Sequence, residues 1–142
     1  MIFFIEGTPK PQARPRGFKG RHGVFSPTTE WKESVKYNGK QWGVKFSGAL
    51  RVNMVFMFHR PKSHYGTGKN ANKRKDSAPK YMTSKPDLDN LAKAVLDALQ
   101  DVNVIKDDSA VIELHLRKNY VSRHYDAQGM RIEIIELEKN NE

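Results

Sequence analysis

The sequence predicts an α+β fold in which two main helices pack on one mixed, largely antiparallel sheet. Its 142 residues fit a single domain spanning 1–142. Its patterns run in the order strand, helix, strand, helix, strand, strand, without the regular alternation that marks a parallel α/β sheet. Its hydrophobic content of 37% is sufficient for a core.

The first predicted strand covers residues 2–6, and it is followed by an extended basic arm over residues 7–25. Three prolines, Pro9, Pro11 and Pro15, exclude a helix and a central strand from the arm. We then expect a helix that starts with Ser26 as the N-cap and Pro27 in its first turn, and that runs to about residue 45. Gly39 and Gly43 weaken its second half.

Residues 49–59 predict the second strand, because large apolar side chains occupy every second position. A basic loop over residues 60–86 follows, with eight Lys or Arg and a single Asp. A connection of this length inside a compact domain is usually functional or disordered.

The clearest helix is predicted over residues 87–102, where an apolar stripe continues without Gly or Pro. Two strands are expected over 110–121 and 129–138. The turn-forming residues between them predict that these strands pair as a hairpin.

Charge divides the chain into a basic and an acidic part, within a total of +9. Residues 1–85 hold 18 Lys and Arg but 4 Asp and Glu, a balance of +14, whereas residues 86–142 have a balance of −5. A basic surface favours a polyanionic partner such as nucleic acid. The acidic part suggests carboxylates that a metal ion bridges to phosphate, as in a nuclease, although uneven charge by chance is the simpler reading.

Four carboxylates lie in two pairs at predicted element boundaries, Asp87 with Asp89 and Asp107 with Asp108. A structural explanation is available for the first pair, since Asp at a helix start caps N–H groups. Lys93 is one helical turn after Asp89, so an ordinary solvated ion-pair face is a further alternative. Two carboxylates about 5 Å apart repel by about 3 kcal/mol at an effective dielectric constant near 20, a cost that a divalent cation would remove.

The segment from Lys85 to Leu99, KPDLDNLAKAVLDAL, and the segment from Val104 to Val111, VIKDDSAV, form a combined pattern. It closely resembles the RusA family of Holliday junction resolvases, which has a D-L-D-N-L-x-K helix, a D-A-L continuation and a D-D pair at this distance. The longer connection before the helix and the proline-rich arm depart from that family.

This resemblance implies a RusA-like fold and a homodimer that nicks two opposed strands of a four-way DNA junction, leaving 5′-phosphate and 3′-hydroxyl ends. Asp87, Asp89 and Asp108 resemble the family's metal ligands, with Mg²⁺ as the cofactor and Mn²⁺ as a substitute. Lys93 resembles its catalytic lysine. Three further matching residues would have supporting roles, and these are Asn90, Asp97 and Asp107.

Basic residues in the arm and the loop are expected to contact DNA phosphates. These candidates are Arg14, Arg16, Arg21, Lys69, Lys73, Arg74, Lys75, Lys80 and Lys85. A solvated surface without contacts is the alternative for each of them. For the whole protein the alternatives are a non-catalytic protein that binds branched nucleic acid and a flap-type or RNA-directed nuclease.

The composition also excludes several classes of function. The absence of cysteine excludes disulfide scaffolds, thiolate zinc sites and cysteine nucleophiles. The sequence has no apolar run long enough to span a membrane, and its apolar start is too short for a signal peptide. We therefore expect a cytoplasmic protein without a membrane partner.

Overall fold

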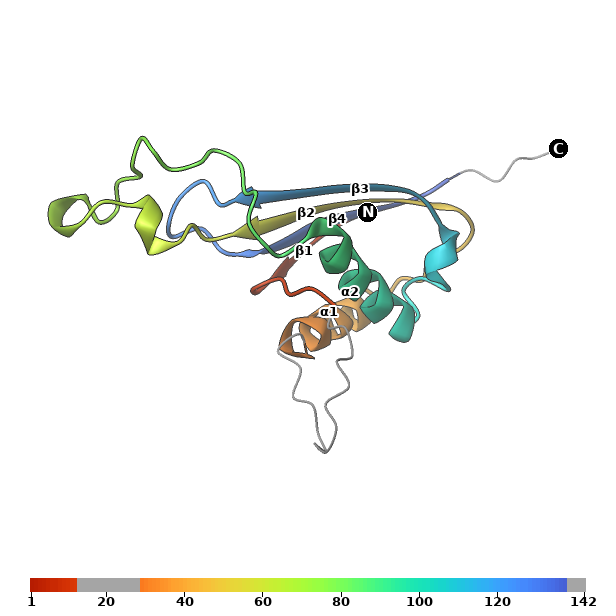
Figure 1. Cartoon of the computed structure of the whole chain (residues 1–142). Coiled ribbons are helices and arrows are strands. Elements are labelled where there is room, and N and C mark those ends of the chain that lie inside the picture. The colour runs from red at the N-terminus through yellow and green to blue at the C-terminus, as the bar shows by residue number, and fades with distance from the viewer. Residues whose placement is uncertain (13–28, 138–142) are drawn as a thin grey trace, which may run out of the picture.

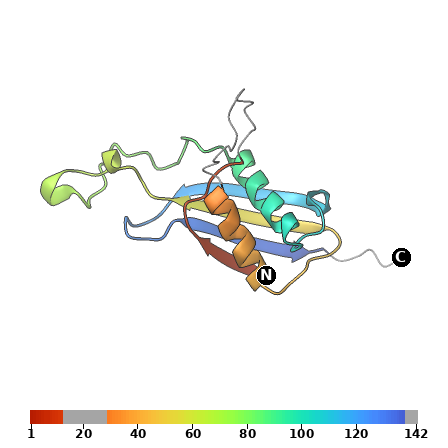
Figure 2. The same cartoon turned by 90° about the horizontal axis from the view of Figure 1, so that it is seen from below.

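The computed structural model describes residues 1–12 and 29–137. Both helices cover the same face of a four-stranded sheet (Figure 1 and Figure 2). This arrangement confirms the predicted α+β class, with two helices on one mixed sheet. The elements in chain order are β1 (Ile2–Glu6), α1 (Thr29–Gln41), β2 (Leu50–Phe58), α2 (Leu88–Asp101), β3 (Val111–Tyr120) and β4 (Gly129–Glu136).

The sheet has the strand order β1-β4-β2-β3. Strand β4 pairs antiparallel with both β1 and β2, and β3 pairs parallel with β2, so the sheet is mixed and largely antiparallel. The predicted hairpin between β3 and β4 is wrong, because β2 lies between these two strands. The apolar side chains at every second position of β2 are all buried, which suits a strand with a neighbour on each side.

The core lies between the sheet and the helices. The five alternating apolar residues of β2 face the helices and are at most 6% exposed, which confirms the predicted strand face. Helix α2 contributes most of the opposing surface. Its buried side chains are Leu91, Ala92, Ala94, Val95, Ala98 and Leu99.

Helix α1 ends at Gln41, four residues before the predicted end. Gly43 takes a left-handed conformation with φ of 65°, which a continuing helix does not allow, and Trp42 stacks on Phe3 with the ring centroids 3.9 Å apart. Gly39 is buried against α2, where a Cβ atom would lie 3.3 Å from Leu99. The predicted start at Ser26 and Pro27 lies outside the described residues.

Residues 60–86, here called the basic lobe, extend beyond one end of the sheet (Figure 1). The lobe contains two short 3₁₀ turns, Lys62–His64 and Gly68–Asn70, and a β-bridge between Tyr65 and Arg74. The first residue of the lobe, Arg60, contacts its last third, because the guanidinium donates a hydrogen bond to the Pro79 carbonyl at 2.6 Å. The predicted loop is therefore irregular but folded.

Neither α1 nor α2 has the length and apolar character that crossing a lipid bilayer requires.

Candidate functional site

Asp87 is the N-cap residue of α2, with an extended backbone at φ −76° and ψ 141°. Its carbonyl accepts the Leu91 N–H at 3.1 Å, but its carboxylate caps no backbone N–H of α2. Capping therefore does not account for this side chain. The carboxylate is exposed and available to another partner.

Three carboxylates and one lysine line a single pocket of about 270 Å³ between α2 and β3. Asp89, Lys93 and Asp97 follow one another at four-residue intervals along α2, so they share one helical face. Asp108 reaches the same pocket from the turn before β3, and apolar side chains of β3 and α2 complete its lining. We call this the acidic pocket.

The turn before β3 is a single 3₁₀ turn, Asp108–Ala110, and Asp107 caps it. The Asp107 carboxylate accepts the Ser109 N–H at 2.9 Å, and this hydrogen bond is the main cause that lowers the Asp107 pKa. The Asp108 N–H donates to Gln100 Oε1 at 3.1 Å, which ties the turn to α2. Asp107 thus has a structural part in presenting Asp108.

Negative charge is crowded at Asp108. A hydrogen bond with the Asp107 side chain is the main cause that raises the Asp108 pKa, followed by burial and by the charges of Asp107 and Asp97. The raised pKa means that these surroundings make the charged form of Asp108 less favourable than it is in water, an effect that a nearby cation would offset.

The ion-pair alternative for the α2 face is not what the structure contains. Within residues 1–12 and 29–137, Lys93 forms no salt bridge with Asp89 or Asp97. Its ammonium group is exposed at the acidic pocket and remains available to an anionic ligand.

The donor types around the acidic pocket are those that Mg²⁺ prefers, since carboxylate oxygens are hard ligands. In the described part of the chain, however, no three His, Asp or Glu side chains already converge on one ion position. Asp87 and Asn90 instead line a second, larger pocket. The structure therefore brings Asp89, Lys93, Asp97 and Asp108 together and leaves Asp87 on the other side of the helix start.

Lys118 of β3 holds the segment that leads into α2, a role that the sequence alone did not suggest. Its ammonium group donates hydrogen bonds to the carbonyls of Ser84 at 2.6 Å and Pro86 at 2.9 Å. Lys118 lies on the helix-facing side of β3, in register with the buried Phe56 of β2. The sequence does carry a signal for this contact, because a lysine stands at a strand position whose alternation predicts an inward-facing apolar side chain.

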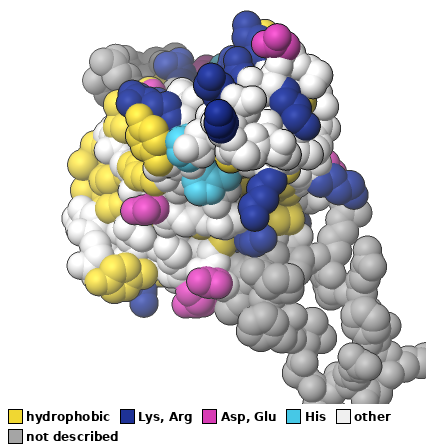
Figure 3. All heavy atoms as spheres, turned by 90° about the vertical axis from the view of Figure 1, so that its left-hand side faces the viewer, with side chains coloured by type: hydrophobic (Ala, Val, Ile, Leu, Met, Phe, Trp, Pro, Cys, Tyr) yellow, Lys and Arg dark blue, Asp and Glu magenta, His cyan; other side chains and the backbone are white. Residues whose placement is uncertain are grey.

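The basic lobe presents its cations to solvent at one end of the molecule, where Figure 3 shows Lys and Arg side chains gathered. Every predicted DNA-binding residue in the lobe is exposed. They are Lys69, Lys73, Arg74, Lys75, Lys80 and Lys85. The three predicted in the arm, Arg14, Arg16 and Arg21, lie outside the described residues.

Comparison with known proteins relates this site to a family. The family described as Endodeoxyribonuclease RusA matches residues 6–135, a span that includes both acidic pairs and the basic lobe. The uncharacterized protein YqaN of Bacillus subtilis (strain 168) is 33% identical over 125 residues, which cover 83% of this chain and 86% of that protein. The chain therefore belongs to the RusA family of endodeoxyribonucleases.

Proposed function

We propose that this protein is a Mg²⁺-dependent, structure-selective endodeoxyribonuclease that resolves Holliday junctions by paired nicks. Membership of the RusA family supports endonuclease action on such junctions. The observation that carries the proposal is the acidic pocket, where three carboxylates surround a lysine that is free of salt bridges with them. A structural ion-pair network would have paired these charges.

Asp89 and Asp108 would hold Mg²⁺ or its substitute Mn²⁺ in the acidic pocket. Asp87, whose carboxylate lines the neighbouring pocket at the helix N-cap, would be the third ligand once its side chain turns toward them. When bound, the metal would polarise the phosphodiester and lower the pKa of a bound water molecule. Lys93 would contact the scissile phosphate and offset the negative charge that develops during the reaction. Asp107 supports the site through the turn that carries Asp108.

Asp97 lines the acidic pocket beside Lys93, and its charge contributes to the raised pKa of Asp108. We assign it a supporting part at the edge of the metal site. Asn90 is one residue from Asp89, and its backbone carbonyl accepts the Gln12 N–H at 3.0 Å. Asn90 therefore links the start of α2 to the proline-rich segment after β1.

In-line attack by water on the phosphorus, with the P–O3′ bond breaking and the 3′-oxygen leaving, would give 5′-phosphate and 3′-hydroxyl ends. A homodimer would bring two such sites to the opposed strands of a junction with approximate two-fold symmetry. The exposed cations of the basic lobe would hold the phosphates of the junction arms.

The test is cleavage of a synthetic four-way junction by wild-type protein and by Asp89→Asn, Asp108→Asn and Lys93→Ala. We expect each variant to lose cleavage while it still binds the junction, and EDTA to abolish cleavage by the wild type. Asp101→Asn is the matched control, because Asp101 is exposed on the same helix and pairs with Lys36, outside the acidic pocket.

Full cleavage by Asp108→Asn would refute the assigned site. Binding without any metal-dependent product would instead identify a non-catalytic junction-binding protein. Flap, duplex and RNA substrates, compared with the junction at one salt concentration, test the substrate preference.

A further inference from the structure

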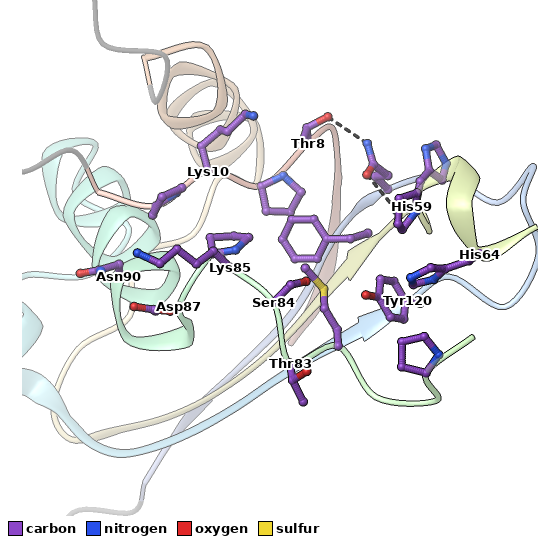
Figure 4. Close-up of a pocket in the computed structure, with 18 residues that line it drawn as sticks. Thr8, Lys10, His59, His64, Thr83, Ser84, Lys85, Asp87, Asn90 and Tyr120 are labelled. Atoms are coloured by element: carbon purple, nitrogen blue, oxygen red, sulfur yellow. Dashed lines mark hydrogen bonds between the residues drawn. The ribbon is translucent and has the colours of Figure 1, made fainter. Parts of the chain in front are cut away.

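A cavity of about 800 Å³ lies beside the start of α2 (Figure 4). Separate parts of the chain wall it: residues 8–11 after β1, the basic lobe with the neighbouring Asp87, and the adjacent ends of β2 and β3. The reaction proposed above uses one residue of its lining, Asp87. The rest of the cavity has no part in that chemistry, and its purpose requires a separate explanation.

The lining combines an apolar interior with a polar and basic rim. Phe58, Met82 and Tyr120 contribute to the interior, together with five prolines, Pro9, Pro11, Pro61, Pro79 and Pro86. Two lysines, Lys10 and Lys85, and two histidines, His59 and His64, also line the pocket. We call this the proline-lined pocket. Its composition suits a ligand with a flat apolar body and an attached anion.

Hydrogen bonds fix one wall of the proline-lined pocket in place. The Gln128 side chain donates to the Thr8 hydroxyl at 2.9 Å and accepts the His59 backbone N–H, also at 2.9 Å (Figure 4). On the β3 side, the guanidinium of Arg60 lies 4.3 Å from the centre of the Tyr120 ring, and the His64 ring packs edge-on against that ring. The cavity is therefore largely formed before any ligand arrives, which lowers the entropy cost of binding.

Strand β3 links this pocket to the acidic pocket. Alternate residues of a strand face the same side, and Leu116, Lys118 and Tyr120 are such a series. Leu116 lines the acidic pocket and Tyr120 the proline-lined pocket, about 13 Å further along the strand. Lys118 lies between them and holds the segment that leads into α2. The spacing along β3 is therefore short enough for one nucleic acid strand to contact both pockets.

We propose that the proline-lined pocket receives one unpaired nucleobase from the strand that is cut. A nucleobase has flat apolar faces, and the sugar-phosphate chain attached to it is anionic, which matches the apolar interior and the basic rim. A base stacked inside a duplex cannot enter such a pocket, but a branch point supplies bases whose pairing is already weakened. This inference rests on the proposed function, because it takes the acidic pocket as the place of the scissile phosphate.

The experiment measures binding of four-way junctions that carry one abasic site, moved nucleotide by nucleotide across the branch point. Binding is followed by fluorescence anisotropy in EDTA, so that the result does not depend on cleavage. For wild-type protein we expect one position at which removal of the base weakens binding about tenfold, the scale of a base that stacks on an aromatic side chain. Equal affinity for every abasic junction would overturn the proposal.

Substitution of Tyr120 completes a thermodynamic cycle. Tyr120→Leu should bind the intact junction about tenfold more weakly, and the sensitive abasic site should then cause no further loss. Tyr120→Phe keeps the ring and should behave as wild type. Tyr125→Leu is the control, since Tyr125 is 66% exposed at the same end of the molecule but lines a different cavity.

Additive losses from Tyr120→Leu and the abasic site would overturn the proposal, because they would show that ring and base act independently. The wild-type scan remains decisive if Tyr120→Leu does not fold. Junction cleavage by a protein that fails the scan would leave the proposed function standing. A positive scan without cleavage would refute the proposed function and the link to a cut strand, and would leave base binding by the pocket.

Discussion

Removal of the Lys118 ammonium group should reduce cleavage without unfolding the protein. In Lys118→Met, the carbonyls of Ser84 and Pro86 lose their shared donor, at 2.6 and 2.9 Å. A hydrogen bond from a charged donor contributes about 1.5–3 kcal/mol. Lys118 is half-buried, so water would replace part of this contribution in the variant. We therefore expect the two hydrogen bonds together to stabilise the segment by about 2 kcal/mol. That free energy corresponds to a factor of about 30 in the population of the closed segment.

Because this segment ends at Asp87, we expect kcat for junction cleavage to fall by up to about 30-fold, with little change in KM. The loss is local, so the thermal midpoint should change little. Lys118→Arg, which keeps a charged donor, should recover part of the rate. Arg117→Met is the matched control, because Arg117 lies on the opposite face of β3. Cleavage by Lys118→Met at the wild-type rate would refute the positioning role.

Three further predictions concern packing, the Asp108 turn and DNA contacts. Gly39→Val should lower the free energy of unfolding by about 1–3 kcal/mol, because the new Cβ would lie 3.2 Å from the Val102 side chain. Urea denaturation measures this change, and an unchanged midpoint would contradict the packing. Asp107→Ala should destabilise the turn by about 0.5–2 kcal/mol, seen as faster amide exchange at Ser109 and slower cleavage, and normal exchange would rule out the capping role. Removal of three lobe cations should reduce the slope of log K against log salt by roughly 2.7 for duplex arms, and an unchanged slope would show that the lobe does not contact phosphates. The substitutions are Lys73→Ala, Arg74→Ala and Lys75→Ala.

The fold class could be predicted because local patterns determine it. Strand β2 and helix α2 have unbroken periodicities, and both form within two residues of their predicted bounds. The pairing of β3 with β2 rather than β4 could not be predicted in this way. A turn sequence indicates that the chain reverses, but it does not indicate whether another strand occupies the space between the two that it joins.

The candidate site was predicted in part for the same reason. Residues at helical spacing, Asp89, Lys93 and Asp97, necessarily share a face, and the turn carrying Asp108 meets them. The side chain direction of Asp87 at the N-cap depends on its tertiary surroundings, and so does the contact of Lys118 with a segment more than 30 residues away. No local pattern contains either relation.

The strand order has a consequence for how the protein folds. Every strand pair in the sheet joins distant parts of the chain, since β1 pairs with β4 and the neighbours of β2 are β3 and β4. Among the strands of the described residues no two neighbours form a hairpin, so long loops must close before any of these ladders forms, which is typical of slow folding. Strand β4 is the last of the four in chain order, so β1 remains without its pairing partner until β4 has been synthesised. Until then the edges of β1 and β2 that pair with β4 remain open to chaperones and to aggregation.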